Sequence, residues 1–184
     1  TLTSTGYRPV GLILDTAQRN SYSWNVSIAG INGNAAPFIQ AVIPGDIILG
    51  ASSSIAPTVG RTRVMPNPYT VWAISDKPES RGQLLWIKNY PAPSGNVTRN
   101  FGPVDAVNRV WTMEDGETMQ WVGYNLDNGA LLWGPTTTQF RDMQFFGSGE
   151  GMGQRGATAY GNLYVQGFGG EIHSYSMKTG SLLW

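Results

Sequence analysis

The chain has 184 residues, of which 41% are hydrophobic and 11% aromatic, which is enough for a dense core in one ordinary domain. Charged residues make up only 13%, and twelve basic side chains balance twelve acidic ones. Without a basic face, binding to nucleic acid or to an anionic membrane surface is disfavoured, and the apolar runs are too short to span a bilayer. The absence of cysteine excludes disulfides, thiolate metal sites and cysteine nucleophiles.

Strands are predicted along the whole chain. Short runs rich in Val, Ile, Leu, Tyr, Phe and Trp are bounded by Gly, Pro, Asn and Asp, and apolar faces with helical period are absent. Two strands at 11–14 and 22–28 are interpreted as the end of an incomplete unit. Three sets of four follow, at 38–42, 46–51, 70–74 and 84–88; at 103–107, 109–113, 118–125 and 131–133; and at 156–159, 163–167, 171–177 and 182–184.

Turn residues fall between these strands, as antiparallel hairpins require. The turns are expected at 44–46, 114–116, 127–129, 160–162, 169–170 and 178–180. The carboxylates of Glu114, Asp115 and Glu117 share one of them, which is expected to be an ordinary exposed turn, with weak Ca²⁺ binding as the alternative. The longer connection at 52–68 is expected to be a solvated loop, with a functional loop as the alternative.

One short pattern occurs three times along the chain. A glycine is followed by two leucines and a tryptophan at 82–86, 129–133 and 180–184, and the tryptophans are 47 and 51 residues apart. A period of this size predicts an array of similar supersecondary units. Ser75, Asn125 and Ser176 precede the glycines, and their short polar side chains are expected to accept hydrogen bonds from the turn backbone two or three residues further on.

The repeated stretch resembles the quinoprotein (PQQ)-like β-propeller repeat, whose outer hairpin runs Ala-x-Asp-x-x-Thr-Gly-x-x-x-Trp. Residues 174–184 are the most similar copy and 123–133 the next, although Ser176 and Asn125 stand where the family has Asp. More narrowly, the chain resembles large exported archaeal proteins that carry such repeats. The resemblance implies that the tryptophans pack between adjacent blades and form a girdle around the ring. The residues concerned are Trp24, Trp86, Trp133 and Trp184, with Gly82, Gly129 and Gly180.

The fold expected from strands and resemblance together is a partial β-propeller of four-stranded antiparallel blades. A two-stranded remnant would occupy residues 1–28, and three blades would occupy about 29–90, 91–138 and 139–184. Propellers have about 4–8 blades, so this is part of a ring with two open edges. The remainder of a longer parent chain, or other copies, would complete it.

The family name raises PQQ-dependent oxidation as a function, and the sequence argues against it. Such enzymes hold the quinone and Ca²⁺ on the ring axis with residues from many blades, and no matching cluster of Asp, Glu and Asn is found here. The lone histidine, His173, is interpreted as structural. The glycine-rich segment 147–156, with Arg155, lacks the context of a phosphate loop and is expected to be a flexible lead into a blade, with an anion cradle as the alternative.

No catalytic or cofactor-binding residue is predicted. Trp72, Trp111 and Trp121 are expected to be buried, although sugar stacking is the alternative for such aromatic side chains. The sequence favours a non-catalytic propeller module of an exported or cell-surface protein, with a PQQ-dependent oxidoreductase fragment and a glycan-binding adhesin module as the alternatives. Two Asn-x-Ser/Thr triplets, at Asn25 and Asn96, would accept glycans in an exported protein.

Overall fold

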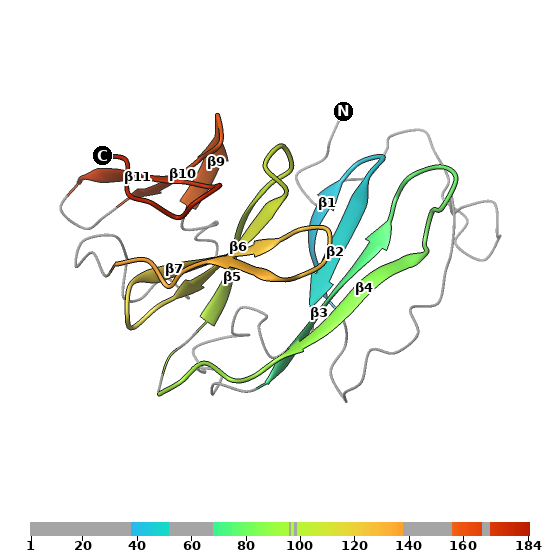
Figure 1. The fold of residues 1–184 in the computed structure, drawn as a ribbon, viewed down its shortest axis with the longest axis horizontal. Coiled ribbons are helices and arrows are strands. Elements are labelled where there is room, and N and C mark those ends of the chain that lie inside the picture. Colours follow the sequence, from blue (N-terminus) through green and yellow to red (C-terminus); the bar gives the residue numbers. More distant parts are fainter. Residues whose placement is uncertain (1–37, 52–67, 96, 98, 138–155, 167–169) are drawn as a thin grey trace, which may run out of the picture.

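The computed structural model describes residues 38–51, 68–95, 97, 99–137, 156–166 and 170–184 (Figure 1). These residues form three separate antiparallel sheets whose strands pair in sequence order. Figure 1 shows the first and third sheets on either side of the second. The predicted all-β architecture is therefore confirmed, as a partial β-propeller of successive sheets. Among the described residues, no helix is long and apolar enough to cross a membrane.

The strands of each sheet follow one another through hairpins. The first sheet contains β1 (Phe38–Ile43), β2 (Ile47–Ala51), β3 (Tyr69–Ser75) and β4 (Leu84–Tyr90). The second contains β5 (Arg99–Asp105), β6 (Val110–Asp115), β7 (Gln120–Asn125) and β8 (Leu131–Trp133). The third contains β9 (Gly156–Ala159), β10 (Asn162–Gln166) and β11 (Ile172–Ser176). In place of the expected strand at 182–184, one isolated bridge joins Tyr175 to Leu182.

The predicted strand at 103–107 is wrong at both ends. β5 begins at Arg99, and its pairing with β6 shifts register between Phe101 and Val104. It ends at Asp105, whose carboxylate accepts hydrogen bonds from the backbone N–H groups of Val107 and Asn108 at 2.9 and 3.1 Å. A side chain that caps the backbone in this way starts a turn, so Val107 lies exposed in the turn and not in the strand.

Each of the three sheets has an outer turn of the same kind, and equivalent backbone hydrogen bonds hold these turns. The N–H of each repeat glycine donates to the carbonyl of the small polar residue that ends the preceding strand, at 2.7–2.8 Å. The pairs are Gly82 with Ser75, Gly129 with Asn125, and Gly180 with Ser176. The φ angles of the three glycines lie between 67° and 80°, a backbone conformation that residues with a side chain disfavour.

The small polar side chains cap these turns as predicted. The Ser75 hydroxyl accepts from the N–H of Lys77, the Asn125 amide oxygen from Asp127 and Asn128, and the Ser176 hydroxyl from Thr179. The donors lie two or three residues further along the chain, so the prediction for Ser75, Asn125 and Ser176 is confirmed.

Two apolar layers join the three sheets. Between the first and second sheets lie eleven of the described residues that are buried, among them Leu49, Val71 and Trp111. Trp111 stacks on Tyr124 at 4.4 Å between ring centroids. Between the second and third sheets, Val110, Trp121 and Trp133 pack with Leu163 and Tyr175 as part of a second layer. Trp72, Trp111 and Trp121 are all 1% exposed or less, so their predicted burial is confirmed.

Burial of tyrosines in these layers predicts a loss of stability in alkali. Burial raises the pKa of Tyr175 to about 12, and it also raises the pKa values of Tyr90 and Tyr124. The folded protein therefore keeps protons that the unfolded chain releases near pH 10, and stability falls as pH rises from about 10 towards 12. In alkaline titrations followed by circular dichroism, Tyr175→Phe is expected to unfold at higher pH than the parent, whereas substitution of the exposed Tyr160 by Phe leaves the midpoint unchanged.

Candidate functional site: the contacts between successive sheets

The described tryptophans of the repeat are placed differently from one another. Trp86 is half-buried against the layer between the first two sheets, and Trp133 is 8% exposed. Trp184, which occupies the same place in the third unit, is 64% exposed. Residues 1–37 lie outside the described part of the chain, so the predictions for Trp24 and Asn25 stay predictions.

Trp86 reaches from the first sheet to the outer turn of the second. Its indole N–H donates to the backbone carbonyl of Leu126 at 2.9 Å. A Cβ atom built on Gly129 would lie 2.8 Å from the Trp86 ring, so the indole lies directly against this glycine. The Tyr90 hydroxyl adds a hydrogen bond of 2.6 Å to the Gly129 carbonyl. The turn therefore offers the indole a carbonyl acceptor and a surface without a side chain.

Trp133 makes the same contact one sheet later. Its indole N–H donates to the backbone carbonyl of Met177 at 2.7 Å, and a Cβ on Gly180 would lie 2.5 Å from its ring. Leu126 and Met177 occupy the same turn position, directly after Asn125 and Ser176, and both are fully buried. An indole seat thus consists of the carbonyl of a buried apolar residue and the glycine three residues after it.

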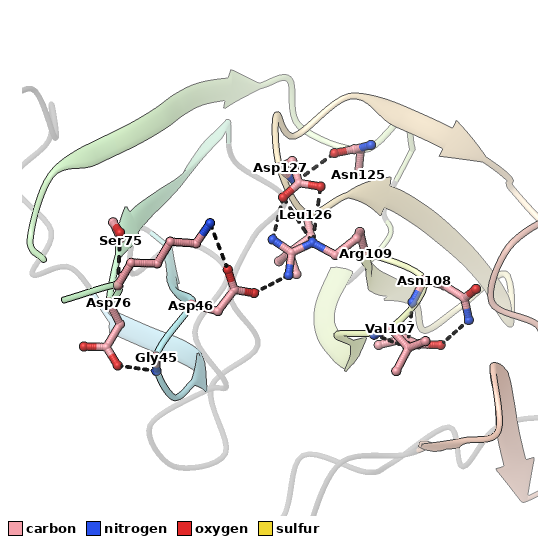
Figure 2. A network of polar contacts seen from close by, with 12 residues as sticks. Gly45, Asp46, Ser75, Asp76, Val107, Asn108, Arg109, Asn125, Leu126 and Asp127 are labelled. Atoms are coloured by element: carbon pink, nitrogen blue, oxygen red, sulfur yellow. Dashed lines mark hydrogen bonds and ion pairs between the residues drawn. The ribbon is translucent and has the colours of Figure 1, made fainter. Parts of the chain in front are cut away.

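A polar network accompanies the first of these contacts (Figure 2). Arg109 lies in the turn between β5 and β6 with φ 58°, and its guanidinium bonds Asp127 of its own sheet and Asp46 of the preceding sheet. Lys77 approaches Asp46 at 4.0 Å. The pKa of Arg109 is raised overall. Hydrogen bonds to Asp127 and to Asp46 raise this pKa, and together they outweigh burial, which lowers it. The network ties two sheets at their solvent-exposed rim.

Removal of Asp46 is expected to weaken this rim only slightly. The side chains of Arg109 and Asp46 are 30% and 25% exposed, and pairs of this kind contribute about 0.2–1 kcal/mol. Asp46→Ala should therefore lower the free energy of unfolding by less than about 1 kcal/mol at low salt, and by less still in 1 M salt, where screening is strong. Urea unfolding at both salt concentrations measures the effect, with Glu79→Ala as a control that removes an equal charge from an exposed position.

A second ion pair is more deeply placed. The Arg99 guanidinium donates to both carboxylate oxygens of Asp115 at 2.6 Å and to the Tyr69 hydroxyl at 3.2 Å. Burial lowers the pKa of Arg99, but the hydrogen bonds to Asp115 and Tyr69 outweigh it, so the net pKa is raised. Because both oxygens of Asp115 accept from Arg99, this carboxylate is poorly placed to serve as a general base.

The pair lines a cavity of about 320 Å³ beside the second sheet. Its walls are mixed, with aromatic and apolar side chains beside the paired charges and several neutral polar groups. They are formed by Pro93, Ser94, Val97, Arg99, Asp115, Thr118, Gln120, Val122, Tyr124, Leu131, Gly134 and Pro135. The arrangement offers a mixed, partly polar surface on which the charges of Arg99 and Asp115 are paired with each other.

The structure describes only some of the other candidate residues predicted from the sequence. The expectation of an exposed turn at 114–117 is wrong for Glu114 and Asp115, because β6 runs on to Asp115 and both residues are buried. Asp115 pairs with Arg99 across the sheet. His173 lies half-buried in β11 opposite Val165. Within the described ranges, no three His, Asp or Glu side chains are grouped so that they could hold a metal ion. Asn96, Arg155 and most of the segments 52–68 and 147–156 lie outside those ranges.

The contacts made by Arg99 and Arg109 were missed by sequence reasoning. Arg99 and Asp115 are 16 residues apart, and Arg109 and Asp46 are 63 apart. The first pair could have been predicted only from opposite charges at the two ends of one hairpin. The predicted strand began at 103, so Arg99 was not placed in the hairpin opposite Asp115. The second pair depends on how two sheets sit against each other, which no local pattern encodes.

Comparison with known proteins gives likeness in structure only. No protein-family model matches the sequence, and no curated protein is significantly similar to it. Solved structures similar to this one include BamB from Moraxella catarrhalis, a β-propeller with PQQ-like repeats (15% identity, TM-score 0.44, 76% of this chain). They also include two computationally designed proteins, Ika4 (13% identity, TM-score 0.44, 84% of this chain and 74% of Ika4) and Ika8 (12% identity, TM-score 0.41, 78% of this chain and 34% of Ika8). The chain spans 34% of the length of BamB.

Proposed function

We propose that the chain is a non-catalytic β-propeller module of an exported or cell-surface protein, and that it serves as a rigid scaffold for assembly or ligand contact. The observation that carries the proposal is the repetition of one contact, in which the outer turn of the second sheet holds an indole of the first and the outer turn of the third sheet holds an indole of the second. Carboxylates that could otherwise take part in chemistry are paired with arginines. Asp115 is paired with Arg99, and Asp46 and Asp127 are paired with Arg109.

Export is proposed on features of the sequence. Only three lysines occur in 184 residues, charged residues make up 13%, glycine occurs 24 times, and Asn25 and Asn96 stand in glycosylation triplets. Mass spectrometry of native material tests this part of the proposal. Glycans on Asn25 or Asn96 would support export, whereas unmodified asparagines together with intracellular recovery of the protein would contradict it.

The scaffold role is tested against the enzyme alternative. The purified protein is titrated with pyrroloquinoline quinone and Ca²⁺, and its absorbance and alcohol-dependent dye reduction are followed. No saturable spectral change and no turnover are expected, because the described residues include no group of carboxylates that could hold the metal. Saturable quinone binding with turnover would contradict the scaffold proposal and favour an oxidoreductase.

A further inference from the structure

One of the three outer turns has an asparagine directly before its glycine. Asn128 precedes Gly129 in the turn of the second sheet, whereas Arg81 and Thr179 precede the equivalent glycines of the first and third sheets. Asparagine loses its side-chain amide most readily when glycine follows it, because glycine has no side chain to hinder attack by its backbone nitrogen. The turn that receives Trp86 therefore contains a side chain that can react with its own backbone.

The reaction consumes only water. The Gly129 nitrogen loses its proton and bonds the Asn128 Cγ atom, the Cγ–Nδ2 bond breaks, and Nδ2 leaves as ammonia with the transferred proton. Water then adds to the resulting succinimide at either of its two carbonyl carbons. One opening gives aspartate at position 128. The other gives isoaspartate, in which the main chain runs through the side chain and is longer by one carbon atom.

The electrophile of this reaction is accessible in the folded turn, and the nucleophile is not. The Asn128 side chain is exposed, and its Oδ1 atom accepts from the N–H of Ala130 at 2.8 Å, which keeps the amide beside the turn backbone and polarises its carbonyl. Gly129 is buried, and its N–H donates to the Asn125 carbonyl at 2.8 Å. Since the attack requires this N–H to leave Asn125 and to lose its proton, the glycine nitrogen limits the reaction.

Two aromatic side chains of the first sheet hold Gly129 in this protected position. A Cβ atom on Gly129 would lie 2.8 Å from the Trp86 ring, and the Trp86 indole N–H donates to the Leu126 carbonyl at 2.9 Å. The Tyr90 hydroxyl donates to the Gly129 carbonyl at 2.6 Å. An opening of the turn that frees the Gly129 N–H is therefore opposed by contacts with the first sheet.

We propose that Asn128 is a site of spontaneous deamidation that is closed while Trp86 and Tyr90 occupy the turn and open when they leave it. Isoaspartate at position 128 lengthens the main chain just before Gly129, so that the glycine no longer meets both the Asn125 carbonyl and the indole. The modification is therefore expected to prevent the indole from docking again, which makes a transient separation of the two sheets permanent. The site depends only on the folded turn and is independent of the proposed scaffold function.

Peptide mapping by mass spectrometry, on protein aged in mildly alkaline buffer, measures the reaction at Asn128 and separates it from Asn32, the other asparagine that precedes a glycine. Asn32 lies outside the described residues. The folded protein is expected to deamidate at Asn128 about tenfold or more slowly than protein unfolded in guanidinium chloride, since it reacts only through local opening. Deamidation of the folded parent as fast as that of the unfolded chain would overturn the proposal.

Trp86→Phe tests the coupling to the first sheet. Phenylalanine cannot donate to the Leu126 carbonyl, so the folded variant should deamidate about fivefold faster than the parent, which is the effect of one lost hydrogen bond on the opening equilibrium. Trp133→Phe makes the same change at the contact between the second and third sheets and should deamidate at the parental rate. An equal rate in the two variants, whether raised or not, would overturn the proposal, because the contact at Gly129 would then not control the reaction.

Hydrogen exchange tests the consequence of the modification. In molecules with isoaspartate at position 128, the Trp86 indole N–H is expected to exchange about tenfold faster or more than in the parent. Asn128→Asp is the matched control, because it makes the same change of charge without lengthening the main chain, and it should keep the parental exchange rate. Unchanged exchange in the isoaspartate form would contradict the loss of docking.

Discussion

Replacing Trp133 with alanine is expected to lower the free energy of unfolding by about 3–5 kcal/mol. The indole is almost completely buried between two sheets, so its removal leaves a large cavity in the layer that includes Leu163 and Tyr175. It also leaves the Met177 carbonyl without the N–H that now donates to it. The loss should be measured by urea or guanidinium unfolding followed by circular dichroism.

Leu132→Ala is the matched control for this experiment. Leu132 is the preceding residue of the same strand, but 46% of it is exposed, so its truncation should change the free energy of unfolding by no more than about 0.5 kcal/mol. A loss below about 1 kcal/mol for Trp133→Ala, in the range of an exposed position, would mean that the indole does not hold the sheets together.

The second large effect is expected from the ion pair between Arg99 and Asp115. Their side chains are 16% and 9% exposed, and the carboxylate depends on the guanidinium for both of its oxygens. Arg99→Met should therefore lower the free energy of unfolding by about 3–5 kcal/mol, because it leaves a buried negative charge unpaired. Thermal and denaturant unfolding at pH 7 measure this loss.

The double variant Arg99→Met with Asp115→Leu separates the cost of an unpaired charge from the value of the pair. Replacement of both partners by apolar side chains of similar size removes the buried charge, so most of the lost stability should return. If the double variant is as unstable as Arg99→Met alone, the cause is packing around the cavity and not the unpaired Asp115 carboxylate.

Local patterns predicted the strands and outer turns well. Turn formation depends on residues close in sequence, and Ser75, Asn125 and Ser176 cap their turns through donors two or three residues away. The burial of Trp72, Trp111 and Trp121 likewise followed from their places inside apolar strands. Features of this kind are visible in a single sequence because the groups that interact are neighbours along the chain.

Contacts between sheets were less accessible to sequence reasoning. Arg109 of the second sheet bonds Asp46 of the first sheet. Asp115 was expected in an exposed turn because no residue near it in the sequence indicated that Arg99 is its partner. The end of β5 was misplaced because Asp105 caps a turn that the pattern of apolar residues concealed. In each case the deciding partner is a polar side chain whose position is set by pairing register or by packing between sheets.

Similar repeat segments can also differ in burial, because burial depends on the neighbouring sheet and not on the segment itself. Trp133 and Trp184 end nearly identical segments, yet one is buried and the other is exposed. Similarly, Asp76 stands at a turn position that is apolar in the other two units. A repeat therefore predicts the conformation of each unit, whereas the environment of each unit depends on which neighbour it meets.

The most direct test of the indole contacts is hydrogen exchange at the tryptophan side chains, followed by ¹H–¹⁵N NMR. The indole N–H groups of Trp86 and Trp133 donate to the carbonyls of Leu126 and Met177, so both should exchange slowly. The exposed Trp184 should exchange at the rate of a free indole. Exchange of Trp133 as fast as Trp184 would contradict the account, because the sheets would then not be held together by their tryptophans.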